Sequence, residues 1–335
     1  MQNRITNRLP LFCAALCLFL AAASPAASAK KFKYARIGNP EDSHASPQFG
    51  IAMMGGGKDL DEAFKWLCGL GNGGDFLIIR SRGTDDYNPY VRDLCKANSV
   101  ATLILPDHAS AEDPAVAEII HKAEVLFIAG GDQAHYLHDW TGTPVNTAIN
   151  EHIAAGKPIG GTSAGLAVLG QFVFGAFHDT AISKDVLPNP YSDEVTLVRD
   201  YLKISLLDDT ITDSHFAKRN RMGRSLVFLA RIMKDGWSEH PREIAIDERS
   251  AVLVNADGSA TVVGTGLGAY FMKPTEPPAT CEKNTPLTMN GISVYRGVTG
   301  SHFDLRTWEG TGGKSYTLNV ESGVIHSTQP NDDTY

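Results

Sequence analysis

The pentapeptide Gly161-Thr162-Ser163-Ala164-Gly165 has the Gly-x-Ser-x-Gly form of a nucleophile elbow. In such an elbow the serine stands on a sharp turn between a strand and a helix, and the glycines leave room for neighbouring elements. A short apolar stretch precedes the turn, and Leu166–Leu169 follows it. The sequence therefore predicts Ser163 as a nucleophile, with the Ala164 N–H donating to the developing oxyanion. A glycine-rich packing turn is the alternative interpretation.

A serine nucleophile needs a general base, and the base needs an acid to orient it. Of eleven histidines, His215 is the best candidate, because it follows a strand-like apolar stretch and precedes a helical one. Asp247 and Glu248 end another short apolar stretch, and spacing alone does not choose between them. A structural histidine and a solvated acidic turn are the alternatives. The order serine, histidine, acid differs from the order in α/β-hydrolases and argues against a lipase or esterase.

The elements that must position these residues alternate between strands and helices in the first half of the chain. Apolar runs and capping signals predict strands at 50–54, 75–80, 99–105, 124–129 and 157–160, and helices at 88–97, 114–121 and 144–155. This alternation predicts an α/β fold with a mostly parallel sheet sandwiched by helices. Ligands bind beyond the carboxyl ends of such strands, where the glycine loops 55–57 and 130–131 and the serine turn lie.

The second half of the chain has a different pattern. It predicts a helix over 216–234, a hairpin over 251–264 and a proline-rich linker over 273–279, followed by a small C-terminal β appendage. Arg4, Arg8, the apolar run 9–23 and the small residues 27–29 predict a secretory signal peptide. An uncleaved membrane anchor is the alternative, but the run is short for a span. The expected organisation is a signal peptide (1–29), an α/β hydrolytic domain (30–272) and a β-rich extension (273–335).

Composition and charge narrow the class of protein. Hydrophobic residues make up 43% of the 335 residues, charged residues make up 20%, and the net charge is −8. These values are typical of a globular protein and exclude a collagen, a coiled coil and a strongly basic nucleic-acid-binding surface. Cleavage near Ala29 predicts a secreted or periplasmic protein without membrane contact. It leaves Cys68, Cys95 and Cys281, whose pairing the spacing does not give.

Four blocks together resemble the cyanophycinase family of serine peptidases: GGDQ at 130–133, GTSAG at 161–165, DSHFAKRNRMGR at 213–224 and IDE at 246–248. The resemblance implies a glutamine-amidotransferase-like fold, usually dimeric, without a cofactor or metal. It implies Ser163 as nucleophile, His215 as base and Glu248 as the acid, with Gly56 and Gly57 in a loop that supplies a second oxyanion N–H. Members of this family hydrolyse cyanophycin, multi-L-arginyl-poly-L-aspartate, to β-aspartyl-arginine dipeptides, and related members are aspartyl dipeptidases.

The same resemblance implies substrate contacts. They would come from Gln133, Asp213, Arg219, Arg221 and Arg224. Planar guanidinium groups suit the bidentate binding of carboxylates, although a basic helix face exposed to solvent is the plainer interpretation.

One position departs from the family, because Ser214 stands where the family typically has glutamine. The departure leaves open a peptidase for other aspartyl or isoaspartyl peptides. A non-catalytic secreted binding protein on the same scaffold is a third alternative. His135 and His138, with Asp132 nearby, resemble part of a metal site. No third ligand is evident, and we expect no metal there.

Overall fold

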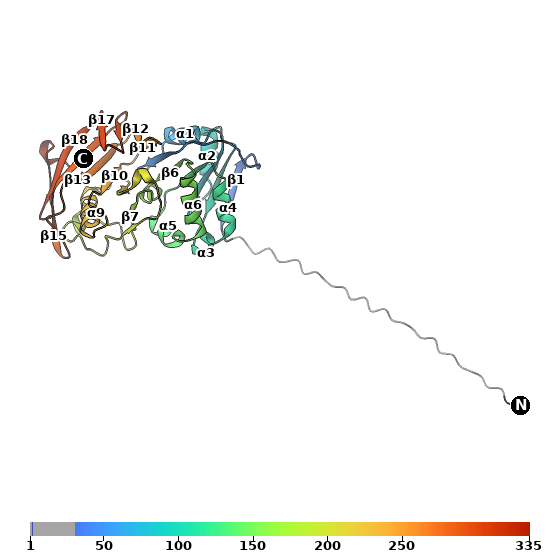
Figure 1. The fold of residues 1–335 in the computed structure, drawn as a ribbon, viewed down its shortest axis with the longest axis horizontal. Helices are drawn as coiled ribbons and strands as arrows, with labels where there is room; N and C mark the ends of the chain where they lie inside the picture. Colours follow the sequence, from blue (N-terminus) through green and yellow to red (C-terminus); the bar gives the residue numbers. More distant parts are fainter. Residues whose placement is uncertain (1, 3–30) are drawn as a thin grey trace. The chain divides into compact units, whose positions relative to one another are not determined.

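Two large β-sheets organise the described part of the chain, which comprises residue 2 and residues 31–335 of this computed structural model (Figure 1). The predicted signal peptide lies outside the described residues, apart from residue 2. Residues Lys31–Tyr335 form one compact unit. Within the described residues, none of the helices combines the length and the apolar character needed to span a bilayer.

The first sheet has ten strands in the order β1-β4-β3-β5-β6-β2-β11-β12-β16-β17. The five strands from β4 to β2 are parallel and largely buried, as the alternating pattern predicts, and the others join antiparallel. The bounds are β1 (Lys33–Gly38), β2 (Gly50–Met54), β3 (Asp75–Arg80), β4 (Ser99–Ile104), β5 (Val125–Ile128), β6 (Ile159–Thr162), β11 (Ser250–Asn255), β12 (Ser259–Gly264), β16 (His302–Asp304) and β17 (Glu309–Thr311).

Helices cover both faces of this sheet because successive strand residues point to opposite sides. Phe76 and Ile78 pack with α1 and α2, whereas Leu77 and Ile79 pack with α4 and α6. Asp113 caps α4 with its side chain, and Pro114 occupies the first turn. The bounds are α1 (Asp61–Leu70), α2 (Tyr87–Leu94), α3 (His108–Ala111), α4 (Pro114–Lys122), α5 (Gln133–Trp140), α6 (Pro144–Ala154) and α7 (Ala164–Ala167). A disulfide between Cys68 and Cys95 ties α1 to the end of α2.

The second sheet has nine strands, in the order β19-β18-β15-β13-β10-β9-β7-β8 with β14 paired to β15. Helix α9 packs on it through an almost wholly buried sequence. The bounds are β7 (Phe172–Phe174), β8 (Leu197–Arg199), β9 (Thr210–Asp213), β10 (Arg242–Ile246), β13 (Ala269–Pro274), β14 (Thr280–Glu282), β15 (Thr285–Gly297), β18 (Lys314–Glu321) and β19 (Val324–Ser327), with α8 (Ser183–Val186), α9 (Met222–Lys234), and the 3-10 turns η1 (Ser205–Leu207) and η2 (Pro330–Asp332).

Two sequence expectations need correction. The predicted helix over 216–234 begins only at Met222, because residues 216–221 form a turn in which Asn220 has a φ of 50°. The predicted linker over 273–279 is partly strand, since Lys273 and Pro274 belong to β13 and pair with β15. The prolines that follow mark a bend between paired strands. Residues 273–335 are rich in strands, but these strands extend both sheets, as Figure 1 shows at the end marked C.

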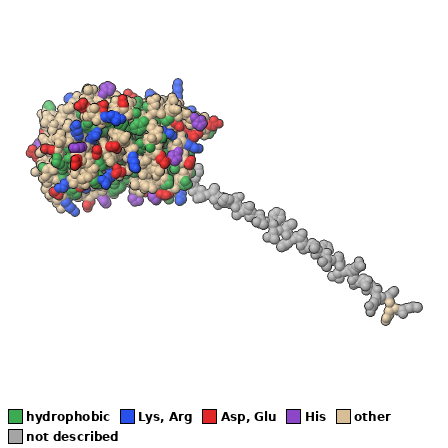
Figure 2. All heavy atoms as spheres, in the orientation of Figure 1, with side chains coloured by type: hydrophobic (Ala, Val, Ile, Leu, Met, Phe, Trp, Pro, Cys, Tyr) green, Lys and Arg blue, Asp and Glu red, His purple; other side chains and the backbone are tan. Residues whose placement is uncertain are grey.

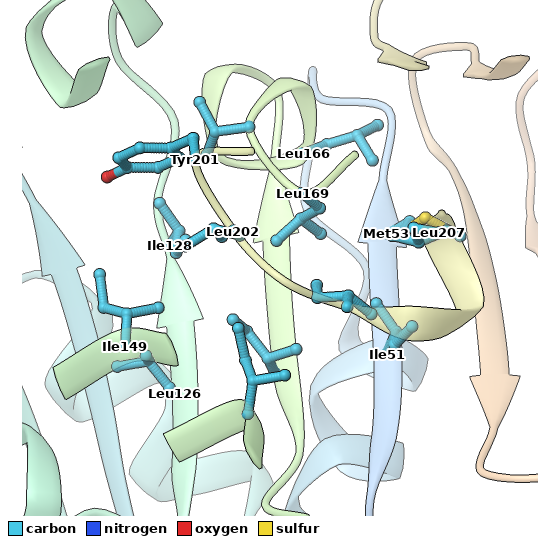
Figure 3. Packing of buried hydrophobic residues seen from close by; sticks show 14 of the residues in the cluster. Ile51, Met53, Leu126, Ile128, Ile149, Leu166, Leu169, Tyr201, Leu202 and Leu207 are labelled. Carbon is cyan, nitrogen blue, oxygen red and sulfur yellow. The ribbon is translucent and has the colours of Figure 1, made fainter. Parts of the chain in front are cut away.

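A buried apolar cluster supports the turn that carries Ser163. Figure 3 shows side chains of this cluster from β2, β5, α6, the α7 region and residues 201–207. Each fully buried aliphatic side chain contributes about 1.5–3 kcal/mol relative to exposure. The labelled members are Ile51, Met53, Leu126, Ile128, Ile149, Leu166, Leu169, Tyr201, Leu202 and Leu207.

Candidate active site

Ser163 stands between β6 and α7 with φ 54° and ψ −117°, in a backbone conformation that a residue with a Cβ rarely adopts. The two flanking glycines make this turn possible. A Cβ at Gly161 would lie 2.3 Å from the carbonyl oxygen of Gly165, and one at Gly165 would lie 2.0 Å from the carbonyl oxygen of Ile128. The motif therefore has the strained strand-to-helix geometry of a nucleophile elbow.

The structure brings the three predicted residues together. The Ser163 Oγ and the Nε2 of His215 are 2.7 Å apart, and the Nδ1 of His215 is 2.7 Å from Oε1 of Glu248. With the proton on Nδ1, the ring donates to Glu248 and accepts from the serine hydroxyl. Asp247 points elsewhere, because its carboxylate accepts the backbone N–H of Lys218 at 2.8 Å. The structure thus selects Glu248 from the pair that spacing left open.

These side chains come from different sheets. Ser163 follows β6 of the first sheet, whereas His215 follows β9 and Glu248 follows β10 of the second. Strands β9 and β10 are parallel neighbours, so their carboxyl ends present His215 and Glu248 side by side. The backbone N–H of His215 donates to Gly55 O at 2.8 Å and joins the second sheet to the loop after β2.

The electrostatics of the Ser163–His215–Glu248 triad, called the relay below, suit His215 as a general base. Burial lowers the pKa of the His215 imidazole below its ordinary value, and the guanidinium groups of Arg219 and Arg221 act in the same direction. The hydrogen bond from His215 lowers the pKa of the Glu248 carboxyl. At neutral pH the imidazole is therefore neutral and the carboxylate is ionised. This is the state in which His215 can take a proton from Ser163.

Glycine loops flank the serine because β6 lies between β5 and β2. Gly56, after β2, adjoins the His215 ring: a Cβ there would lie 2.6 Å from Cε1 and Nε2. Gly130, after β5, lies against the serine itself, with 3.4 Å between a Cβ there and Ser163 Cβ. Gly57 adjoins Glu248, and Ala164 opens α7, whose first N–H groups have no acceptor inside the helix. The sequence pattern placed the 130–131 loop at the same end of the sheet as the serine turn, and the structure adds the close approach of Gly130 to Ser163.

The predicted substrate residue Asp213 is buried against two of the predicted arginines. Its Oδ2 accepts Arg224 Nε at 2.8 Å, and its Oδ1 accepts the Ser214 N–H at 2.7 Å and groups of Arg221 and Arg224. Burial alone would raise the pKa of Asp213, but the charges of Arg224 and Arg221 hold it below the ordinary value. In this conformation Asp213 is buried, both of its carboxylate oxygens accept hydrogen bonds from the protein, and it positions the arginines. One sequence cannot reveal this long-range pair.

Arg219 differs from its two neighbours. It is exposed, and its guanidinium has no hydrogen-bond or ion-pair partner among residues 31–335. Its charge nevertheless lowers the pKa of both His215 and Glu248, so it lies near the relay. Of these three arginines, Arg219 therefore has the guanidinium group that is most available to a carboxylate.

A cavity of about 310 Å³ contains the predicted substrate residues other than Asp213. It is lined by Gln133, Arg219, Arg221 and Arg224, together with Gly131 and residues of the 174–180 segment. Gln133 begins α5, and its Nε2 donates to Phe174 O at 3.4 Å. Asp132 and Asp179 also line this cavity, so its wall carries charges of both signs, as does the face seen in Figure 2.

The histidines considered as metal ligands do not converge with Asp132. His135 and His138 both face Asp139, at 3.3 and 3.0 Å, and Asp132 caps α5 by accepting the Ala134 N–H. Within the described part of the chain, no group of three or more His, Cys, Asp or Glu side chains is placed to hold a metal ion.

The chain is similar in sequence to proteins named cyanophycinase. A cyanophycinase from Synechococcus elongatus is 28% identical over 228 residues, which cover 66% of this chain and 65% of the relative, a little under two thirds of its length. A cyanophycinase from Geminocystis herdmanii (strain PCC 6308) is 29% identical over 218 residues, or 63% of this chain and 73% of the relative. A solved peptidase from an acI-B1 Actinobacterium superposes with a TM-score of 0.48 at 18% identity, over 84% of this chain and 97% of that chain.

The family match covers all three residues Ser163, His215 and Glu248. Peptidase family S51 matches residues 80–261, which is more than half of the chain. That span includes Ser163, His215 and Glu248, and the fold is the α/β arrangement that the sequence predicts. The chain belongs to peptidase family S51.

Proposed function

We propose that this protein is an exported serine-type exopeptidase that hydrolyses cyanophycin to β-Asp-Arg dipeptides through an acyl-enzyme. One observation carries the proposal: the Ser163–His215–Glu248 relay lies near an exposed arginine, Arg219, that lines a cavity with Gln133. A polymer with an aspartate backbone presents carboxylates and β-aspartyl amides together. The relatives named cyanophycinase support the same substrate class.

In the proposed reaction, His215 takes the Ser163 proton as the hydroxyl attacks the β-aspartyl carbonyl carbon. The N–H of Ala164 and one from the glycine loop at Gly56–Gly57 donate to the oxyanion. His215 then gives its proton to the leaving amine. Water attacks the acyl-enzyme with His215 again as base, and Glu248 holds the imidazole in the productive tautomer throughout.

In the proposed function, the arginines that line the cavity bind the substrate. Arg219 offers an unpaired guanidinium to a substrate carboxylate, whereas Asp213 holds Arg221 and Arg224 in place from below. The Gln133 side-chain amide, which also lines the cavity, can donate or accept a hydrogen bond. The arrangement favours a substrate that has both a carboxylate and polar amide groups.

Two observations support the proposal of export. The N-terminal residues have the pattern of a signal peptide, and Cys68 and Cys95 form a disulfide, a bond that persists in oxidising compartments. We expect cleavage near Ala29, which the mass of the mature protein recovered from culture medium and from periplasm would test. The homodimer implied by the family resemblance is a further expectation, which light scattering on the purified protein would test.

The deciding experiment is the clearing of a cyanophycin suspension by the mature protein, with the products identified by mass spectrometry. Ser163→Ala is the control, because it keeps the fold and removes the nucleophile. We expect clearing and β-Asp-Arg release by the wild type alone. If folded wild-type protein leaves the suspension turbid, cyanophycin is not the substrate.

Ser214 favours a second candidate function, a peptidase for other aspartyl or isoaspartyl peptides. The residue is buried beside the Asp213–Arg221 pair, with its carbonyl oxygen 2.7 Å from Arg221 Nη1. A serine here is smaller than the glutamine that the family typically has, so the adjoining substrate site differs in shape. Hydrolysis of short isoaspartyl peptides by wild type, without clearing of cyanophycin, would support this candidate.

A further inference from the structure

The turn that carries Arg219 and Arg221 is anchored by a residue that follows it by more than a hundred positions. The Tyr335 hydroxyl accepts the backbone N–H of Met222 at 2.9 Å and donates to Oδ1 of Asn220 at 3.0 Å. Met222 opens α9, and its N–H has no acceptor inside the helix. One hydroxyl therefore joins the end of the turn to the start of the helix.

The ring of Tyr335 packs beside the start of the same turn. It meets Phe216 edge-on, with centroids 5.7 Å apart, and Tyr270 in the same manner at 5.9 Å. Phe216 directly follows His215. Burial raises the pKa of Tyr335 to about 12, so its hydroxyl stays neutral and keeps its donor. The side chain thus contacts both ends of the turn.

The main chain around Tyr335 is itself fixed to the second sheet. The Tyr316 hydroxyl, on β18, donates to Thr334 O at 2.9 Å. The Gln329 side-chain amide donates to Asp333 O at 2.9 Å and to Tyr335 O at 3.3 Å. Because these contacts hold residues 329–335 against β18, Tyr335 is a fixed support for the turn.

His215 has supports of its own. Its backbone N–H donates to Gly55 O, its ring bonds Glu248, and Phe216 N–H donates to Ile246 O at 3.3 Å. The far end of the turn is different, because Asn220 adopts a φ of 50° and is held by Tyr335 and by Ser183, whose Oγ donates to Asn220 O at 2.6 Å. Loss of the Tyr335 hydroxyl would loosen the arginine-bearing end and leave the base in place.

We propose that Tyr335 is a positioning residue for substrate binding, which holds the 216–221 turn so that Arg219 faces the cavity. The role rests on the proposed function, since it concerns how Arg219 meets a substrate carboxylate. Tyr335 lies outside the segment that matches the family, which ends at 261. The positioning would therefore be a property of this chain's C-terminal strands.

The test compares Tyr335→Phe with Tyr295→Phe in the mature full-length protein. Tyr295 is a matched control, because it is a buried tyrosine of β15 in the second sheet whose hydroxyl donates to Thr311 O at 2.7 Å, away from the turn. Three quantities are measured: amide hydrogen exchange at Met222, KM and kcat for a soluble trimer of β-Asp-Arg, and the Ser163-dependent hydrolysis of p-nitrophenyl acetate, which has no carboxylate. Removing one hydrogen bond changes such equilibria by about 2- to 10-fold.

For Tyr335→Phe we expect faster exchange at Met222 and a KM for the trimer raised about 2- to 10-fold, with kcat and ester hydrolysis unchanged. Tyr295→Phe should change none of these. Unchanged exchange at Met222, or faster exchange with an unchanged KM, would overturn the proposal. If wild type hydrolyses the ester but not the trimer, the proposed function fails separately, and the exchange comparison still decides whether Tyr335 holds the turn.

Discussion

Replacing Gly56 by alanine tests whether the catalytic geometry depends on the close approach of the backbone to His215. The added Cβ would lie 2.6 Å from two imidazole ring atoms, whereas ordinary van der Waals contact begins at 3.4 Å. The ring must therefore withdraw by about 0.8 Å. That shift breaks the 2.7 Å contact with Ser163, and a misplacement of about 1 Å lowers rates by about 10²-fold. We expect kcat/KM to fall about 100-fold.

Gly56 has a φ of 92°, so an alanine there also strains the backbone by about 1–2 kcal/mol. Gly142→Ala separates the backbone strain from the steric contact with His215. Gly142 has a φ of 75°, but a Cβ there would meet nothing within 4 Å. Both variants should lose similar stability in thermal unfolding, and only Gly56→Ala should lose activity on a β-aspartyl peptide. A folded Gly56→Ala protein whose kcat/KM stays within a few-fold of wild type would refute the reasoning.

Three further predictions concern the relay and the scaffold. Glu248→Gln should lower kcat by about 10³- to 10⁴-fold, since the imidazole loses its orienting acceptor, whereas Asp247→Asn should lower it less than 10-fold; steady-state kinetics of folded variants compares them. The pH profile of kcat/KM should rise through an apparent pKa below about 6.5, because the base must be unprotonated and burial lowers the pKa of His215; a midpoint above 7 would contradict this. Replacing Cys68 and Cys95 together by serine should lower the free energy of unfolding by about 3–4 kcal/mol, from the 27-residue separation, as measured in urea under non-reducing conditions.

The parallel half of the fold could be predicted because its signals are local. The strand at 75–80 contains the apolar run 76–79, and Pro114 after a capping aspartate marks the start of a helix. The serine turn was predictable for the same reason, since the residues that shape it are within two positions of Ser163. These elements are therefore specified by residues that are close to them in the sequence.

What could not be predicted depends on distant partners. The segment 216–221 has a helical composition, but its backbone is held in a turn by contacts with Asp247, Ser183 and Tyr335. The choice between Asp247 and Glu248 followed from which carboxylate the β10 turn aims at His215. The strands beyond residue 273 had an alternating pattern, but nothing in that pattern says which sheet each strand joins.

The division of the relay between two sheets has a consequence for how the protein loses activity. The chain leaves the second sheet at the end of β15, enters the first as β16 and β17, and returns to the second as β18. This path connects the half that bears the serine to the half that bears the histidine. Phe271 of the second sheet also stacks on Phe303 of the first, with ring centroids 3.8 Å apart. The two halves cannot separate far while this connection is intact. Inactivation on heating should therefore coincide with unfolding of the C-terminal strands. These strands would then determine how long the protein stays active at high temperature.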